Sequence, residues 1–317
     1  MYIDVINLTK KLMSIPSVSG DELAILAFLK SILPDCGFSS IRKIPLKDGT
    51  YCLAASKGKS DAWIVGHTDT VPGIVPIEEK KGKLFGRGSC DTKGNIAAAL
   101  IASKNLTDIN LLLTVGEESD FRGAKRVAED NGVMKGKRFL ILEPTSSEFM
   151  DGQRGAILLE VSAEGAQKHS AFIEKTSENA IHNVVEALNI LGKHKFPSWN
   201  VGTIRGGVAK NIVAPECFAE VTIRPATLKE FRDVLLAIEE TQKILSNVTL
   251  NIKTALEPLE GGKQKQGFTE AYFFRGNGRD VNILGAGDLH VAHSPEEYVP
   301  IAELKVLPKK IAGWARG

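Results

Sequence analysis

The pattern of apolar and polar positions divides the chain into two parts. In the first part, amphipathic helices and apolar strands alternate, with predicted ranges 3–14, 21–33, 51–55, 62–66, 95–105, 110–115, 122–130 and 139–142. Ser19 and Glu22 have the spacing of a capping box at the start of the second helix. Runs that are apolar throughout are typical of strands buried on both faces of a largely parallel sheet. Such alternation predicts an α/β fold, with a mixed, largely parallel sheet covered by helices.

The pattern changes after residue 152. Strand, helix, strand, strand, helix and strand are predicted at 156–163, 177–191, 201–205, 217–224, 228–244 and 248–254. This βαββαβ order suits a small antiparallel sheet with two helices on one face. The chain then returns to a strand at 281–284 and a helix after Pro300. We therefore expect one domain from residues 1–152 and 258–317, interrupted by an inserted α+β domain of residues 153–257.

Composition restricts the function only loosely. The 317 residues carry a net charge of +2, too near neutral to indicate nucleic-acid binding. The longest apolar runs fall short of a membrane span, and the first residues lack a signal-like pattern. A cytoplasmic protein is expected. Irregular spacing favours buried thiols over disulfides or a zinc site for the four cysteines, Cys36, Cys52, Cys90 and Cys217.

Histidine and acidic side chains follow several of the apolar strands. His67 and Asp69 come directly after the strand 62–66, and at positions i and i+2 their side chains face the same way. The pair suits a metal-bound imidazole held by a carboxylate, with a polar surface turn as the alternative. Asp91 stands just before a helix, where it could bind metal or act as an N-cap.

Further carboxylates occupy equivalent places. Glu117 and Glu118 follow the strand 110–115 and project differently, so one could bind metal while the other faces a substrate. A solvated acidic turn is the alternative. Glu143 follows the strand 139–142, and His293 comes after the last strand. Because ligand sites in open α/β sheets occur at the carboxyl ends of strands, we expect most of these residues at one edge of the sheet.

Five segments, in order, resemble the metal-site motifs of the M20 metallohydrolases (aminoacylase/carboxypeptidase-like). They are 66–72 (GHTDTVP), 86–94 (GRGSCDTKG), 114–118 (TVGEE), 143–145 (EPT) and 292–296 (AHSPE). The resemblance runs from about residue 12 to residue 300. It implies a zinc-peptidase-like catalytic domain that hydrolyses amide bonds with two divalent metal ions, and an inserted lid domain.

The resemblance also implies a role for each residue. Two ions would be bound by His67 and Glu143 on one side, by Glu118 and His293 on the other, and by Asp91 between them. Glu117 would be the general base, Asp69 would orient His67, and the peptide bond after Asp91 would be cis. These ligand types suit zinc, with cobalt or manganese as alternatives. Three carboxylates and one hydroxide would balance the charge of two divalent ions.

Three residues of the inserted domain resemble lid positions of the family. His169, in 165–170 (GAQKHS), would help to stabilise the oxyanion, often across a dimer interface. Asn211 and Arg224 would hold the substrate, and the planar guanidinium of Arg224 suits a carboxylate. A structural histidine and a surface salt bridge are the alternatives for His169 and Arg224. A homodimer through the lid is expected.

Two segments, 67–76 (HTDTVPGIVP) and 82–88 (GKLFGRG), look most like one branch of the family. Its members release lysine or ornithine from an amino-group carrier protein, and relatives deacetylate N-acetylornithine or N-acetyl-lysine. An acidic carrier would be favoured by Lys80, Lys81 and Lys83, although acidic residues precede them.

Other functions stay open at this point, since residues 263–276 match no family pattern. The alternatives are an acetylornithine deacetylase, a succinyl-diaminopimelate desuccinylase, a dipeptidase or aminoacylase, and a metal-free binding protein of the same fold.

Overall fold

The computed structural model describes residues 4–196, 198–276 and 278–317. They form two compact units, Met1–Asp151 with Thr269–Gly317, and Gly152–Phe268. The sequence pattern predicted the second boundary after residue 257, whereas the structure places it after Phe268. Residues 258–268 stay with the inserted unit because the main-chain N–H of Gln153 donates to Leu259, and that of Arg154 donates to Lys265.

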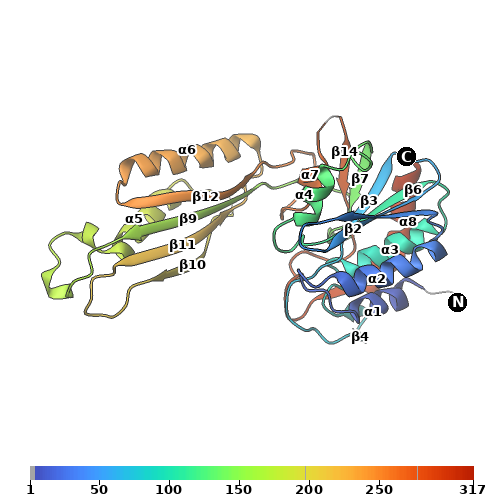
Figure 1. Ribbon diagram of the computed structural model, residues 1–317, viewed down its shortest axis with the longest axis horizontal. Coiled ribbons are helices and arrows are strands. Elements are labelled where there is room, and N and C mark those ends of the chain that lie inside the picture. The colour runs from blue at the N-terminus through green and yellow to red at the C-terminus, as the bar shows by residue number, and fades with distance from the viewer. Residues whose placement is uncertain (1–3, 197, 277) are drawn as a thin grey trace. The chain divides into compact units, whose positions relative to one another are not determined.

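A six-stranded sheet forms the centre of the first unit (Figure 1). In spatial order its strands are β1 (Ser40–Pro45), β2 (Tyr51–Lys57), β6 (Ile109–Thr114), β3 (Ala62–His67), β7 (Arg138–Ile141) and β14 (Asp280–Ile283). The last four are parallel, and β2 and β1 extend the sheet in antiparallel fashion. Every residue of β3 and β6 is buried. The mixed, largely parallel sheet is therefore confirmed.

Helices cover both faces of this sheet. They are α1 (Val5–Met13), α2 (Leu23–Ile32), α3 (Lys93–Ser103), α4 (Arg122–Ala128), α7 (Ala271–Phe274) and α8 (Ile301–Arg316). Gly66 of β3 faces α3, since a Cβ there would lie 3.1 Å from Ile96. Phe139 of β7 stacks on Phe274 of α7, with ring centroids 5.1 Å apart. Phe139 is paired with Trp63, three residues before Gly66, so the two contacts lie on opposite faces.

A small antiparallel sheet connects two loops of the first unit. It consists of β4 (Glu78–Lys80), β5 (Lys83–Phe85) and β15 (Tyr298–Pro300), in the order β15-β5-β4. Residues 83–85, within the segment 82–88, form the strand β5. Its pairing with β15 brings the segment before Asp91 beside the segment after His293.

The predicted capping box does not form. Ser19 Oγ donates to the carboxylate of Asp69 at 2.6 Å instead. Glu22 precedes α2 without a side-chain cap, and its buried carboxylate accepts a hydrogen bond from Arg122 at 2.5 Å. Both side chains are drawn away from the helix terminus by partners that lie far along the chain.

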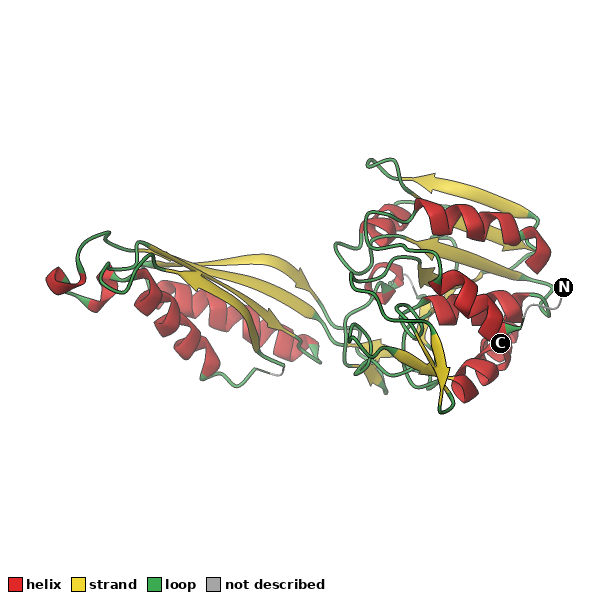
Figure 2. Cartoon of the chain, turned by 90° about the horizontal axis from the view of Figure 1, so that it is seen from below, coloured by secondary structure: helices red, strands yellow, loops and turns green. Residues whose placement is uncertain are grey.

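The inserted unit has the predicted βαββαβ order. Its elements are β9 (Ala156–Glu164), α5 (Ala180–Gly192), β10 (Asn200–Gly206), β11 (Glu216–Ile223), α6 (Leu228–Ile244) and β12 (Val248–Leu256). The strands form an antiparallel sheet in the order β10-β11-β9-β12. Figure 2 shows both helices on one face of it, where Leu159 and Val161 of β9 share a core with Val184 and Ile238. A parallel pair, β8 (Gly152–Gln153) and β13 (Gln264–Lys265), completes the unit.

The structure also describes the cysteines and the apolar character of the helices. All four cysteines are buried and free. Among the described residues, no helix combines the length and the apolar character needed to cross a membrane.

Candidate metal centre

The carboxyl ends of three parallel strands carry four of the predicted site residues. His67 ends β3, Glu117 and Glu118 follow β6, and Glu143 follows β7. The register pairs His67 with Thr114, the last residue of β6, so the neighbouring strands end level with each other. As a result, ligand atoms of His67, Glu117 and Glu143 all lie within 4.8 Å of one another.

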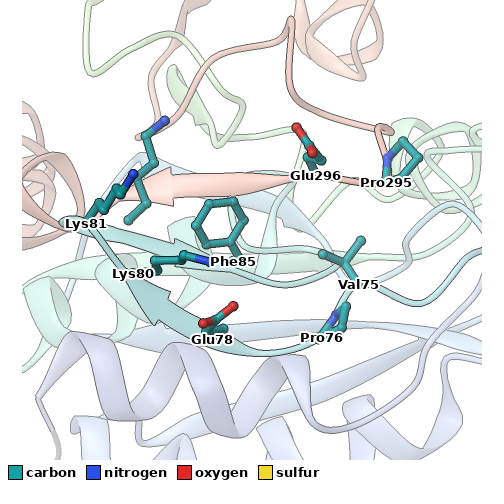
Figure 3. A pocket seen from close by; sticks show the side chains of 9 residues that line it. Val75, Pro76, Glu78, Lys80, Lys81, Phe85, Pro295 and Glu296 are labelled. Atoms are coloured by element: carbon teal, nitrogen blue, oxygen red, sulfur yellow. The ribbon is translucent and has the colours of Figure 1, made fainter.

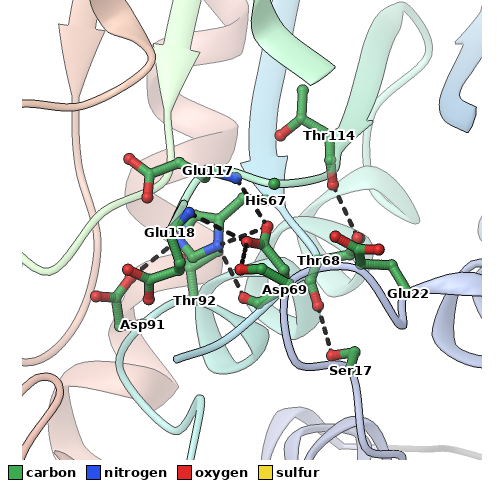
Figure 4. A network of polar contacts seen from close by, with 12 residues as sticks. Ser17, Glu22, His67, Thr68, Asp69, Asp91, Thr92, Thr114, Glu117 and Glu118 are labelled. Carbon is green, nitrogen blue, oxygen red and sulfur yellow. Dashed lines mark hydrogen bonds and ion pairs between the residues drawn. The ribbon is translucent and has the colours of Figure 1, made fainter. Parts of the chain in front are cut away.

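Asp91 joins two imidazoles. Its Oδ1 lies 3.0 Å from His67 Nε2, and its Oδ2 lies 3.2 Å from His293 Nε2. His293 Nε2 is also 2.9 Å from Glu118. His67, Asp91 and Glu118 form a second group whose ligand atoms lie within 4.8 Å of one another, and Figure 4 shows these three side chains together. All five predicted metal ligands thus meet in one cluster.

The loop before α3 presents Asp91 to this cluster. The peptide bond between Asp91 and Thr92 is cis, as the resemblance implied. The alternative of an N-cap role for Asp91 is wrong, since Thr92 occupies that position and no side chain caps α3. The Asp91 carboxylate therefore faces the two imidazoles rather than the helix.

Asp69 anchors the turn that carries both glutamates. Its Oδ1 accepts a hydrogen bond from the main-chain N–H of Glu117, and its Oδ2 accepts one from that of Glu118, both at 3.1 Å (Figure 4). His67 Nδ1 lies 3.0 Å from the main-chain oxygen of Asp69 and 3.7 Å from its carboxylate. Asp69 thus contacts His67 and also fixes the positions of its neighbours in the cluster.

Like charges crowd together at this site. Glu143 is 3% exposed, Asp91 5% and Glu117 9%. Burial, and next the carboxylate of Glu143, raise the pKa of Glu117 well above its usual range. Hydrogen bonds to Asp91 and Glu118 raise the pKa of His293 to about 10. Bound cations would relieve this repulsion, and the donor set of carboxylates and imidazoles fits divalent metal ions.

The three predicted lid residues lie in the inserted unit. A β-bridge joins His169 to Ile212, next to Asn211, so His169 and Asn211 are neighbours, and both are exposed. Arg224 lies at the other end of the sheet. The reason is that β9 and β11 are antiparallel, and His169 follows the end of β9 while Arg224 follows the end of β11.

Two buried glutamates beside the cluster were not among the site residues predicted from the sequence. Glu270, 1% exposed, accepts a hydrogen bond from Thr114 Oγ1 at 3.0 Å, and burial raises its pKa to about 8. Glu297, fully buried, accepts from the main-chain N–H groups of Cys90 and Asp91. Glu270 lies in the segment that matched no pattern. Glu297 directly follows the last motif, and that adjacency was the available signal.

A family model described as peptidase family M20/M25/M40 matches residues 63–316. The chain belongs to this family. It is a hydrolase of the M20 type, with the mixed α/β catalytic domain and inserted domain of its relatives.

Individual relatives span nearly the whole chain. A peptidase M20 domain-containing protein of Schizosaccharomyces pombe is 30% identical over 95% of this chain and 81% of its own length. An acetylornithine deacetylase of Myxococcus xanthus is 27% identical over 91% of this chain and 88% of its own. The crystal structure of a tripeptidase from Staphylococcus aureus has the same fold, with a TM-score of 0.83 at 19% identity over 98% of this chain and 97% of that one.

The raised pKa of Glu270 predicts a pH-dependent loss of stability in the metal-free M20 protein. The pKa of this carboxyl is about 8 in the folded chain and about 4.3 when unfolded. Its stabilising contribution to the free energy of unfolding is therefore complete below pH ~4.3 and is lost as the pH rises through 8. Glu270→Gln, which stays neutral, should reduce the fall in unfolding free energy between pH 5 and pH 9 by at least about 1 kcal/mol. Urea unfolding in EDTA measures this.

The exposed Glu129→Gln is the matched control and should follow the wild type. Identical pH profiles for Glu270→Gln and the wild type would show that Glu270 is already ionised in the folded chain.

Proposed function

We propose that this protein is a two-metal amidohydrolase that releases lysine or ornithine from an N-acyl derivative. The observation that carries the proposal is the position of Asp91, whose two oxygens each face a different imidazole within hydrogen-bond distance. The similarity to the acetylornithine deacetylase of Myxococcus xanthus, over most of both chains, supports a diamino acid as the amine product.

In this proposal the cluster divides into two sets of ligands. His67 and Glu143 would hold one ion, Glu118 and His293 would hold the other, and Asp91 would lie between them. The contacts that support the division are His67 Nε2 to Glu143 at 3.8 Å and His293 Nε2 to Glu118 at 2.9 Å. When bound, paired divalent ions polarise an amide carbonyl and lower the pKa of water. Zinc suits the mixed donors best, with cobalt or manganese as alternatives.

Glu117 is the proposed general base. It takes a proton from the attacking water, the water oxygen bonds to the carbonyl carbon, and Glu117 returns the proton to the amine as the C–N bond breaks. A buried carboxyl with a raised pKa is suited to hold that proton between the two steps. The Asp69 carboxylate positions Glu117 by accepting a hydrogen bond from the main-chain N–H of Glu117. No protein nucleophile is needed.

The inserted unit supplies the proposed substrate contacts. His169 stabilises the oxyanion, and Asn211 and Arg224 hold the substrate. The exposure and adjacency of His169 and Asn211 suit a contribution to the active site of a second copy, so we propose a homodimer through this unit. Four buried free thiols fit a reducing, cytoplasmic compartment.

The acyl group is proposed to be an acidic amino-group carrier protein. A cavity of about 400 Å³ lies between the loop after β3 and the residues just beyond His293, and Lys80, Lys81 and Lys83 line it (Figure 3). Glu78 and Glu296 line it too, so the charge is mixed but positive on balance. A free N-acetyl group is the second candidate, favoured by the deacetylase relative.

A panel of substrates tests the proposed specificity. We expect N-acetylornithine, N-acetyl-lysine or carrier-linked lysine to be hydrolysed with a kcat/KM at least about tenfold above succinyl-diaminopimelate and dipeptides. Turnover of dipeptides with no activity on any lysine or ornithine derivative would reject the assignment.

Charge reversal at Lys80 and Lys81 distinguishes the carrier protein from a free N-acetyl group as the acyl part of the substrate. The double variant should raise KM for carrier-linked lysine only, whereas an equal effect on N-acetyl-lysine would remove the carrier from the proposal.

The Glu117→Gln variant tests the proton shuttle. It should retain both metal ions but lose about 10²- to 10⁴-fold in kcat, because the amide cannot accept the proton of water. Glu118→Gln, which alters a proposed ligand, should instead lose metal. Elemental analysis beside steady-state kinetics measures both, and near-normal turnover by Glu117→Gln would overturn the base assignment.

A further inference from the structure

Glu297 is a fully buried carboxylate that is not among the proposed metal ligands. Its Oε1 accepts hydrogen bonds from the main-chain N–H groups of Cys90 at 3.2 Å and Asp91 at 3.3 Å. Its Oε2 accepts one from the Arg87 guanidinium at 2.6 Å. Both oxygens are thus engaged by N–H donors of the loop that presents Asp91.

The same residue belongs to the segment that presents His293. It lies four residues after His293 and directly before β15, and its main-chain oxygen accepts from Gly86 N–H at 3.1 Å. Arg87 reaches back in the other direction and donates to the main-chain oxygen of Ser294 at 3.3 Å. The Arg87–Glu297 pair therefore joins two loops that lie far apart in the sequence, since the two residues are 210 positions apart.

His293 itself has a left-handed backbone, with φ of 64°, which residues other than glycine seldom adopt. Its loop therefore has to be held by contacts made outside His293. The buried carboxylate of Glu297 is tolerated beside this loop because Arg87 and two main-chain N–H groups compensate its charge.

From these contacts we infer that Glu297 is a positioning residue that sets the spacing between Asp91 and His293, and with it the affinity of the site for its metal ions. The inference rests on the proposed two-metal function. Outer contacts of this kind orient ligands that are themselves weakly constrained, and their loss commonly costs 10- to 100-fold in metal affinity. Glu297 acts only through Asp91 and His293, so its removal should leave the ligands present but misplaced.

The test is a cobalt titration of the full-length, EDTA-treated protein, followed by visible absorption of the bound Co²⁺. Glu297→Gln keeps the size of the side chain but replaces one acceptor oxygen by a donor that faces other donors. We expect a Kd for cobalt about 10- to 100-fold weaker than the wild type and an altered absorption spectrum. Glu297→Asp, which keeps the charge, should recover part of the affinity.

The control for a merely structural effect is Ile311→Ala, in the buried face of α8. It should lower the unfolding midpoint while leaving the cobalt affinity and spectrum unchanged. Arg87→Gln combined with Glu297→Gln should lose less affinity than the sum of the two single losses, because the two side chains share one contact.

Wild-type cobalt affinity and spectrum in Glu297→Gln would overturn the inference and leave the proposed function intact. A wild-type protein that binds no cobalt would overturn both. Where Glu297→Gln does not fold, Glu297→Asp decides the matter, since an unchanged spectrum with unchanged affinity in that variant contradicts a positioning role.

Discussion

The constraint on which the rest of the structure depends is the crowding of carboxylates at one edge of the central sheet. Asp91, Glu117 and Glu143 are each less than a tenth exposed, and burial raises the mutual repulsion of their charges because little water screens it. The neighbouring parallel strands bring Glu117 and Glu143 to the same edge, since Glu117 comes three residues after the end of β6 and Glu143 two residues after the end of β7. Protonation of Glu117 and His293 relieves part of this repulsion, and the donor set of carboxylates and imidazoles fits divalent cations as a further source of positive charge.

The same kind of hydrogen bonding occurs at two places around the cluster. Asp69 accepts the main-chain N–H groups of Glu117 and Glu118, and Glu297 accepts those of Cys90 and Asp91. In each case a buried carboxylate binds two successive N–H groups of a turn, so the turn cannot rotate its side chains away from the centre. Hydrogen bonds from N–H groups to an ionised acceptor are stronger than neutral ones, which suits loops that carry ligands.

The sequence predicted the parallel strands and all five proposed ligands because apolar runs and contiguous motifs are local signals. It did not predict β1, whose residues Ser40–Pro45 are mostly exposed and lack an apolar run. The capping box failed because distant partners, Asp69 and Arg122, compete for Ser19 and Glu22. Glu270 could not be assigned for the same reason, since its partner Thr114 is far away in the chain, whereas Glu297 stands directly after the last motif.

The most direct test of this account is calorimetric titration of the EDTA-treated protein with zinc or cobalt, together with its unfolding midpoint. We expect two ions bound per chain and a higher midpoint with metal, because ligands that bind only the folded state stabilise it. Binding of no ion, or of a single ion without any rise in the midpoint, would contradict the claim that the crowded carboxylates form a two-metal centre.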